Sequence, residues 1–117
     1  IKETKADKTY TLLVECKRKL TNSDLKRLKA LRSIKQKTPQ RVLHRRADKF
    51  RHRSVKSVAA KLLSPKKFRL TIRCEGGLYV KELVTGDGGR TEPSVSRLLD
   101  TECRPKDLDV LKIHVKE

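Results

Sequence analysis

Polar and apolar residues alternate in three segments of the chain, and an alternation with a period of two predicts β-strands. Residues 9–17 place one set of side chains on a single face, namely Tyr10, Leu12, Val14 and Cys16. Residues 67–74 do the same with Phe68, Leu70, Ile72 and Cys74. Residues 109–116 repeat the pattern with Leu111, Ile113 and Val115. We therefore predict three strands that share one sheet.

Two further segments carry apolar residues at helical spacing. Thr21 offers an N-cap, and leucines then recur at every third position, at Leu25, Leu28 and Leu31. A second short helix is predicted near Pro93, with inward side chains at Val95, Leu98 and Leu99. Residues 55–62 also fit helical spacing, but their position before the turn at Pro65 fits one arm of a β-hairpin equally well. The pattern leaves both alternatives open.

These elements predict an α+β fold, a mostly antiparallel mixed sheet flanked by short helices. No repeat or low-complexity linker divides the 117 residues, so we expect a single domain. Hydrophobic residues make up 35% of the chain and charged residues 38%, which leaves little material for a core. Either bound RNA screens the charge, or a neighbouring segment completes the hydrophobic interior, or both apply. Because the first residue is Ile1, we favour the second alternative and expect a piece of a longer protein.

The charge of the chain is strongly one-sided. Lys and Arg number 31 against 14 Asp and Glu, which gives a net charge of +17 and a pI near 10.3. This excess favours a polyanionic partner, and nucleic acid ranks above a membrane because no apolar stretch is long enough to span a bilayer. No helix-turn-helix spacing, zinc pattern or zipper points to DNA. Nucleic acid is therefore the leading partner, and a basic DNA-binding module is the weaker interpretation.

Residues 35–53 concentrate much of this charge. Pro39 bars a continuous helix, and the apolar side chains available to anchor the segment are Val42, Leu43 and Phe50. We predict an extended connector that faces RNA. Each Lys or Arg that reached a phosphate would release counterions, so binding should depend on salt.

The three cysteines, Cys16, Cys74 and Cys103, stand far apart and show no C-x-x-C spacing. Their odd number, and the absence of histidine at zinc-ligand intervals, argue against a disulfide framework and against a metal site. Cys16 and Cys74 fall in phase with apolar strand positions. They are interpreted as small buried core residues of a protein in a reducing compartment.

The most informative motif follows the strand at residues 67–74. A glycine pair at 76–77 ends the strand, and residues 78–83, Leu-Tyr-Val-Lys-Glu-Leu, begin a helix. Lys81 is thereby placed at a strand-to-helix corner beside the apolar Leu83. A lysine in this position is expected to act as a fixed counter-charge for a carboxylate.

Three motifs together carry a family resemblance. They are Lys8-Thr9-Tyr10, the stretch Thr-Pro-Gln-Arg-Val-Leu-His-Arg-Arg at 38–46, and residues 77–93, in which the corner motif is followed by Gly-Asp-Gly-Gly-Arg-Thr-Glu-Pro. In this order they resemble the C-terminal catalytic half of the archaeal and eukaryotic tRNA pseudouridine synthases that act on the T-loop. The resemblance runs from Lys8 to the end of the chain.

The resemblance implies isomerisation of uridine to pseudouridine in tRNA by one aspartate, without a cofactor, inside the cell in the nucleus or the cytoplasm. It implies that Tyr10 packs on the flipped uracil, that Lys81 pairs with the aspartate, and that Leu83 is an apolar wall of the pocket. The basic motifs would contact RNA through Arg41, His44, Arg45, Arg46 and Arg90.

The same residues have simpler interpretations when the resemblance is set aside. Tyr10 and Leu83 then fit the hydrophobic core, and Lys81 fits a solvated lysine paired with Glu82 or Asp87. The motif context is what favours the functional roles over these alternatives.

The catalytic aspartate is the largest departure from the family. In the family it lies upstream of the Lys-Thr-Tyr motif, whereas here only Asp7 precedes Tyr10, too close to serve. We therefore expect half of an active site, which needs the remainder of the parent catalytic domain and is inactive without it. Leu78 in place of the family's threonine leaves open a second hypothesis, a non-catalytic RNA-binding protein that keeps the fold.

Overall fold

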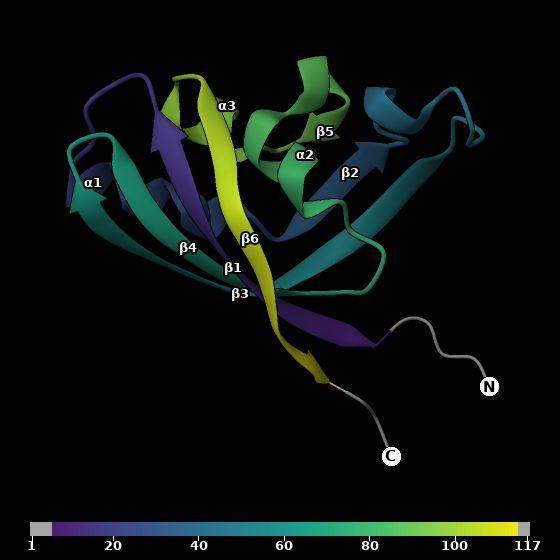
Figure 1. Ribbon diagram of the computed structural model, residues 1–117, viewed down its shortest axis with the longest axis horizontal. Helices are drawn as coiled ribbons and strands as arrows, with labels where there is room; N and C mark the ends of the chain where they lie inside the picture. Colours follow the sequence, from purple (N-terminus) through teal and green to yellow (C-terminus); the bar gives the residue numbers. More distant parts are fainter. Residues whose placement is uncertain (1–5, 115–117) are drawn as a thin grey trace.

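A computed structural model of the chain describes residues 6–114. Six strands form a sheet in the order β5-β2-β3-β4-β1-β6, and every neighbouring pair is antiparallel (Figure 1). The strands are β1 (Asp7–Cys16), β2 (Ser33–Lys37), β3 (Phe50–Ser64), β4 (Lys67–Cys74), β5 (Thr91–Glu92) and β6 (Cys103–His114). The predicted α+β class is confirmed.

Short helices line the sheet and contribute to the core. They are α1 (Asn22–Leu25), η1 (Lys26–Ala30), η2 (Gln40–Val42), α2 (Val80–Thr85), η3 (Asp87–Gly89) and α3 (Val95–Leu99). Thr21 and Asp24 close a capping box at α1, and the predicted leucine repeat is confirmed because its three members are buried, Leu25, Leu28 and Leu31. Ser94 caps α3, in which Val95 and Leu99 are fully buried.

The strands β1 and β4 supply the centre of the core. Leu12 lies opposite Leu70 and Val14 lies opposite Phe68, and none of these four side chains has exposed surface. Each such burial contributes about 1.5–3 kcal/mol. The alternation that predicted both strands is thus confirmed, since it marks the face that packs against the helices.

The long strand β3 joins the two halves of the sheet. Its first part, 50–54, pairs with β2, and its second part, 55–64, pairs with β4, with an irregularity between Val55 and Ser57. In Figure 1 the strand bends, so that β4, β1 and β6 lie to the left and β2 to the right, with α2 and β5 between them. Residues 55–62 are therefore an arm of a β-hairpin rather than a helix.

The prediction of an extended connector at residues 35–53 is wrong in large part. The strand β2 and the start of β3 occupy both ends of this segment. Gln36 is fully buried, so a polar side chain fills a core position and conceals the alternation of β2. Phe50 is 55% exposed and does not anchor the segment, whereas Val42 is buried.

The strand β6 begins at Cys103, before its predicted start at residue 109. The first half of β6 is not predicted because it contains Pro105 and Asp107. Proline has no N–H for the hydrogen-bond ladder. Asp107 has a positive φ of 49° and lies beside a register shift. The position at the edge of the sheet makes the proline tolerable.

The second half of β6 differs from the prediction in its environment. Val110, Leu111 and Ile113 are all more than half exposed, although the last two belong to the predicted apolar alternation. These residues lie on the outer strand, where the sheet has no further neighbour among residues 6–114. Val115 and Lys116, which the sequence assigns to the same strand, lie outside the described residues.

Candidate functional site

The corner between β4 and α2 is built around a glycine that accepts a positive φ. Gly77 has a φ of +94°, and a Cβ atom at this position would lie 2.9 Å from Nε of Arg53. The guanidinium of Arg53 therefore packs directly against the corner. The helix α2 follows at Val80, so the expected helix after the glycine pair is confirmed.

Gln36 fixes the chain just before α2. Its Oε1 atom accepts a hydrogen bond from the Tyr79 N–H at 2.8 Å, and its Nε2 atom donates to the Tyr79 carbonyl at 3.1 Å. Nε2 also donates to Oγ1 of Thr91 at 3.0 Å. One side chain thus satisfies both backbone groups of Tyr79 and connects β2, β5 and the start of α2.

Arg41 forms a two-point ion pair with Glu82. Nε of Arg41 donates to Oε2 at 2.7 Å and Nη2 donates to Oε1 at 3.3 Å. Glu82 is buried while Arg41 is half exposed, and hydrogen bonding to Glu82 raises the pKa of the guanidinium. The guanidinium carbons of Arg41 and Arg51 lie 5.9 and 6.0 Å from the ring centroid of Tyr79. The pair therefore holds η2 against α2.

Arg90 is also committed to internal contacts. Its Nε and Nη2 atoms donate to the carbonyl of Thr38 at 3.2 and 3.0 Å, and Nη2 donates to the carboxylate of Asp48. The carboxylate of Asp87 lies 3.9 Å from Nε of Arg90 and accepts from the N–H of Gln40 at 3.0 Å. This network ties the basic loop at 38–49 to the glycine-rich turn of η3.

The three residues proposed for catalysis lie on neighbouring elements. Tyr10 on β1 is half-buried, and burial raises the pKa of its phenol, which stays neutral. Tyr10 is paired with Val110 of β6, and α2 packs against β6. Lys81 on α2 is exposed, whereas Leu83 has no exposed surface and belongs to the core cluster.

Lys81 forms an ion pair with neither of its candidate acidic partners. Glu82 pairs with Arg41, and Asp87 faces Arg90. Within residues 6–114 no ion pair involves Lys81. Lys81 is therefore an exposed cation in the first turn of α2.

The remaining basic candidates form an exposed group after η2. His44, Arg45 and Arg46 are all exposed, and the side chains make no hydrogen bond or ion pair within the described part of the chain. The five predicted RNA contacts thus divide into two kinds: Arg41 and Arg90 hold the fold together, and the other three point to solvent.

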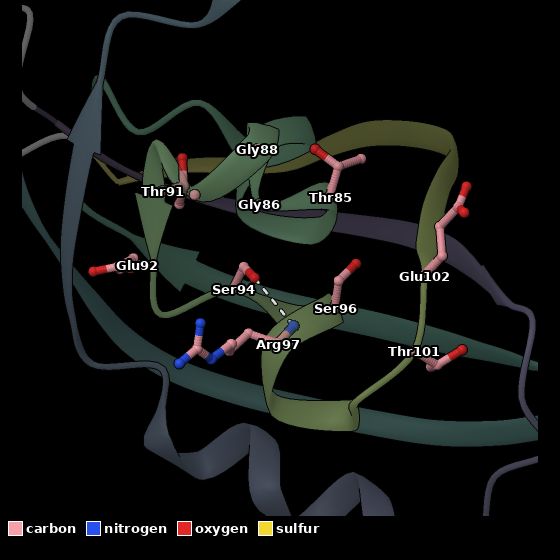
Figure 2. A pocket seen from close by; sticks show the side chains of 11 residues that line it. Thr85, Gly86, Gly88, Thr91, Glu92, Ser94, Ser96, Arg97, Thr101 and Glu102 are labelled. Atoms are coloured by element: carbon pink, nitrogen blue, oxygen red, sulfur yellow. Dashed lines mark hydrogen bonds between the residues drawn. The ribbon is translucent and has the colours of Figure 1, made fainter.

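A separate hollow lies away from these residues. It measures about 380 Å³ and is bordered by η3, β5 and α3 (Figure 2). Ser94 and Arg97 lie on its wall, where the backbone N–H of Arg97 donates to Oγ of Ser94 at 3.2 Å. None of Tyr10, Lys81 and Leu83 lines it. In residues 6–114 no group of three or more His, Cys, Asp or Glu is placed to hold a metal ion.

No helix within 6–114 is both long and apolar enough to cross a bilayer.

The fold is similar to that of known structures over nearly its whole length. The chain superimposes on a chain from the crystal structure of a Cbf5-Nop10-Gar1 complex with a TM-score of 0.73, covering 94% of this chain and 31% of that one. A second match, with a TM-score of 0.65, covers 29% of a chain in the structure of an H/ACA RNP bound to a substrate RNA containing 2'-deoxyuridine. The identities are 18% and 15%, so these matches define the fold.

The sequence then defines the family. The family model described as Pus10, C-terminal matches residues 1–114, and the chain belongs to this family. It is 54% identical over 116 residues to tRNA pseudouridine synthase Pus10 of Methanocaldococcus jannaschii and 43% identical over 110 residues to that of Methanosphaera stadtmanae. These alignments cover 97% and 94% of this chain but 26% and 27% of the relatives. The chain thus spans about a quarter of the length of these relatives, and the family resemblance is confirmed.

Replacement of the buried amide should weaken the corner. Gln36→Leu keeps the approximate volume but leaves the buried N–H of Tyr79 without its acceptor, while the Tyr79 carbonyl keeps the bond from the Leu83 N–H. We therefore expect a loss of about 1–3 kcal/mol in the free energy of unfolding. Urea denaturation of the chain measures it. The exposed neighbour Lys37 supplies the control, and Lys37→Leu should change the free energy by no more than about 0.5 kcal/mol. Equal stability of both variants would contradict the role of Gln36.

The glycine at the corner offers a second test. Gly77→Ala meets both the positive φ and Arg53, and should cost about 2–3 kcal/mol in stability. Gly89 has a similar φ of +92° with nothing within 4 Å of its Cβ position, so Gly89→Ala should cost less. In a protein that already carries Arg53→Ala, Gly77→Ala should cost no more stability than Gly89→Ala does. Thermal and urea unfolding measure both costs. A difference that persists would show that Arg53 does not crowd the corner.

Proposed function

We propose that this chain is the C-terminal part of the catalytic domain of a tRNA pseudouridine synthase that converts uridine to pseudouridine in the T-loop. Its membership of the Pus10, C-terminal family supports the proposal. The observation that carries it is Lys81, which is exposed at the start of a helix whose backbone is held by Gln36. A lysine held in this way is suited to receive a carboxylate from a segment beyond the described residues.

The role of Lys81 is electrostatic. A carboxylate that is enclosed beside a flipped base loses its hydration, and this raises its pKa and favours the inactive protonated form. A lysine next to the carboxylate opposes that shift and favours the ionised form. In the proposed reaction this carboxylate is the catalytic aspartate of the synthase, and no cofactor is required.

Tyr10 and Leu83 complete the proposed pocket from two sides. Tyr10 keeps part of its ring accessible on β1, so it can stack on a uracil that has left the RNA stack. Leu83 is wholly buried beneath α2, and we assign it the apolar backing of the pocket. The packing of Leu83 fixes α2, and in the proposal this places the backbone of Lys81 at a constant distance from the base.

RNA binding is proposed for the exposed basic group and the surface around it. Arg45 and Arg46 are free to reach phosphates, and His44 lies between them and η2. Arg41 and Arg90 shape this surface, because their contacts with Glu82 and Thr38 fix η2 and the loop at 38–49. Such a surface suits recognition of a folded RNA by its backbone and shape.

One observation also favours a second function. The two acidic residues nearest to Lys81 in the sequence face other side chains, since Glu82 pairs with Arg41 and Asp87 lies near Arg90. A non-catalytic RNA-binding protein that keeps the synthase fold would show the same arrangement. Both functions predict RNA binding, but only the synthase predicts turnover by the full-length protein.

The test compares this chain with the full-length protein on an unmodified tRNA transcript. We expect pseudouridine from the full-length protein and none from the chain, because we propose that the catalytic aspartate comes from the remainder of the parent domain. Lys81→Ala in the full-length protein should lower turnover on the order of 100-fold or more while RNA affinity stays nearly unchanged. Lys66→Ala, at the exposed turn between β3 and β4, is the matched control and should retain turnover.

The outcomes separate the hypotheses. Normal turnover by Lys81→Ala together with a large loss of affinity would contradict its assigned role and make it an RNA contact. No turnover by the unaltered full-length protein, with RNA binding retained, would favour the non-catalytic alternative.

The RNA surface is tested through the salt dependence of binding. Arg45→Ala with Arg46→Ala should weaken tRNA binding and reduce the slope of log affinity against log salt by about 2, because each arginine releases about one counterion. Lys17→Ala with Arg104→Ala removes the same charge near Glu102 and should leave the slope nearly unchanged. Equal effects of the two double variants would mean that net charge, and not this surface, governs binding.

A further inference from the structure

Two cysteines that the proposed function does not use meet across the sheet. Cys16 is the last residue of β1 and Cys103 is the first residue of β6, and the two lie directly opposite each other in the antiparallel register. Their Sγ atoms are 2.8 Å apart, although the residues are 87 positions apart in the chain. Both side chains are buried, with 6% and 1% of their surface exposed.

The register places this pair at a site that favours a cross-link. Beyond the pair, the N–H of Lys17 donates to the carbonyl of Glu102, and the N–H of Cys16 points to the other neighbour, where it donates to the carbonyl of Lys66. Cys16 and Cys103 are therefore a non-hydrogen-bonded pair, the kind in which the Cα atoms and side chains of two antiparallel strands come closest. Opposed Cβ atoms at such a pair are near the separation that a disulfide needs.

The surroundings make one of the two thiols the better nucleophile. The hydrogen bond from Cys16 lowers the pKa of Cys103, and the same contact raises the pKa of Cys16. The guanidinium of Arg18 favours the thiolate of both. The N–H of Cys103 donates to Oγ of Ser96 at 3.0 Å, which holds the start of β6 in place.

A hollow at the same end of the sheet reaches Cys16, and local opening of the outer strand would expose Cys103. A hollow of about 240 Å³ is lined by Cys16 together with Glu15, Lys17, Glu102 and Arg104. The edge position of β6 adds a second route, since the first residue of an outer strand can open locally. The third cysteine, Cys74, is fully buried opposite Lys8 and Val55, near the other end of β1.

We propose that Cys16 and Cys103 form a reversible oxidation site, which closes to a cross-strand disulfide in exchange with a disulfide oxidant such as oxidised glutathione. The Cys103 thiolate attacks one sulfur of oxidised glutathione, forms a mixed disulfide and releases one glutathione thiolate. Cys16 gives up its proton, its thiolate attacks Sγ of Cys103, and the second glutathione thiolate leaves. The protein is oxidised by two electrons and one oxidised glutathione becomes two reduced ones.

The bond would join the end of β1 to the start of β6. Because it closes a long loop of chain, it restricts the unfolded state and raises stability. The strand β6 also supports α2, so oxidation would stiffen the outer strand on which that helix rests.

The experiment equilibrates the chain in glutathione buffers of increasing oxidised fraction, followed by alkylation of free thiols and mass spectrometry. We expect the unaltered chain to lose two thiols and about 2 Da, with Cys16 and Cys103 in one cross-linked peptide and Cys74 alkylated. Dithiothreitol should restore all three thiols. Cys74→Ser is the matched control and should behave in the same way, whereas Cys103→Ser should form no internal bond.

Thermal unfolding supplies an independent readout. The midpoint of the oxidised chain should exceed that of the reduced chain on the order of 10 °C, and Cys74→Ser should keep this difference. Three free thiols in every buffer, a cross-link through Cys74, or glutathione that stays attached to one cysteine would each overturn the proposal. So would a midpoint that is unchanged or lower after oxidation.

Discussion

The hydrogen bonds of Gln36 with Tyr79 are the constraint on which the rest of the site depends. The amide is fully buried, and it replaces water for both backbone groups of the residue that precedes α2. Because Gln36 belongs to β2 and α2 packs against β6, the bonds also connect the two halves of the sheet through α2. The start of α2, and with it Lys81, is therefore set by the sheet and not by the surrounding loop.

The few acidic residues have a second organising role. In a chain with a net charge of +17, only a few basic residues can pair with a carboxylate, and those that do so have a structural role. Glu82 pairs with Arg41, which attaches the loop at 38–49 to α2. Asp48 pairs with Arg90, which attaches the same loop to the end of η3. Lys81 lies one residue from Glu82 yet stays exposed, because the buried carboxylate points toward η2. Because carboxylates are few, the paired arginines stabilise the fold and the unpaired basic residues remain exposed, where they can bind a partner.

Much of the fold follows from local pattern, and the remainder depends on contacts that local pattern does not contain. The strands β1 and β4 and the corner after them are predictable because their apolar residues alternate. The strand β2 is not, because Gln36 fills an apolar position with a polar group whose partners lie far along the chain. The start of β6 is not predictable either, because Pro105 is unfavourable in a strand unless the strand lies at the edge of the sheet. The motif predicts the position of Lys81 at the start of α2, whereas the structural contacts of Arg41 and Arg90 depend on where Glu82 and Thr38 lie in space.

The outer strand β6 has a further consequence for the isolated chain. Its exposed apolar residues, Val110, Leu111 and Ile113, accompany a row of backbone groups with no neighbouring strand among residues 6–114, which is the arrangement that invites another copy to add to the sheet. The large positive charge of each copy opposes that approach. A polyanion that neutralises the charge removes the repulsion. The solubility of the chain is therefore lowest where its charge is just balanced, and excess polyanion restores it by reversing the sign.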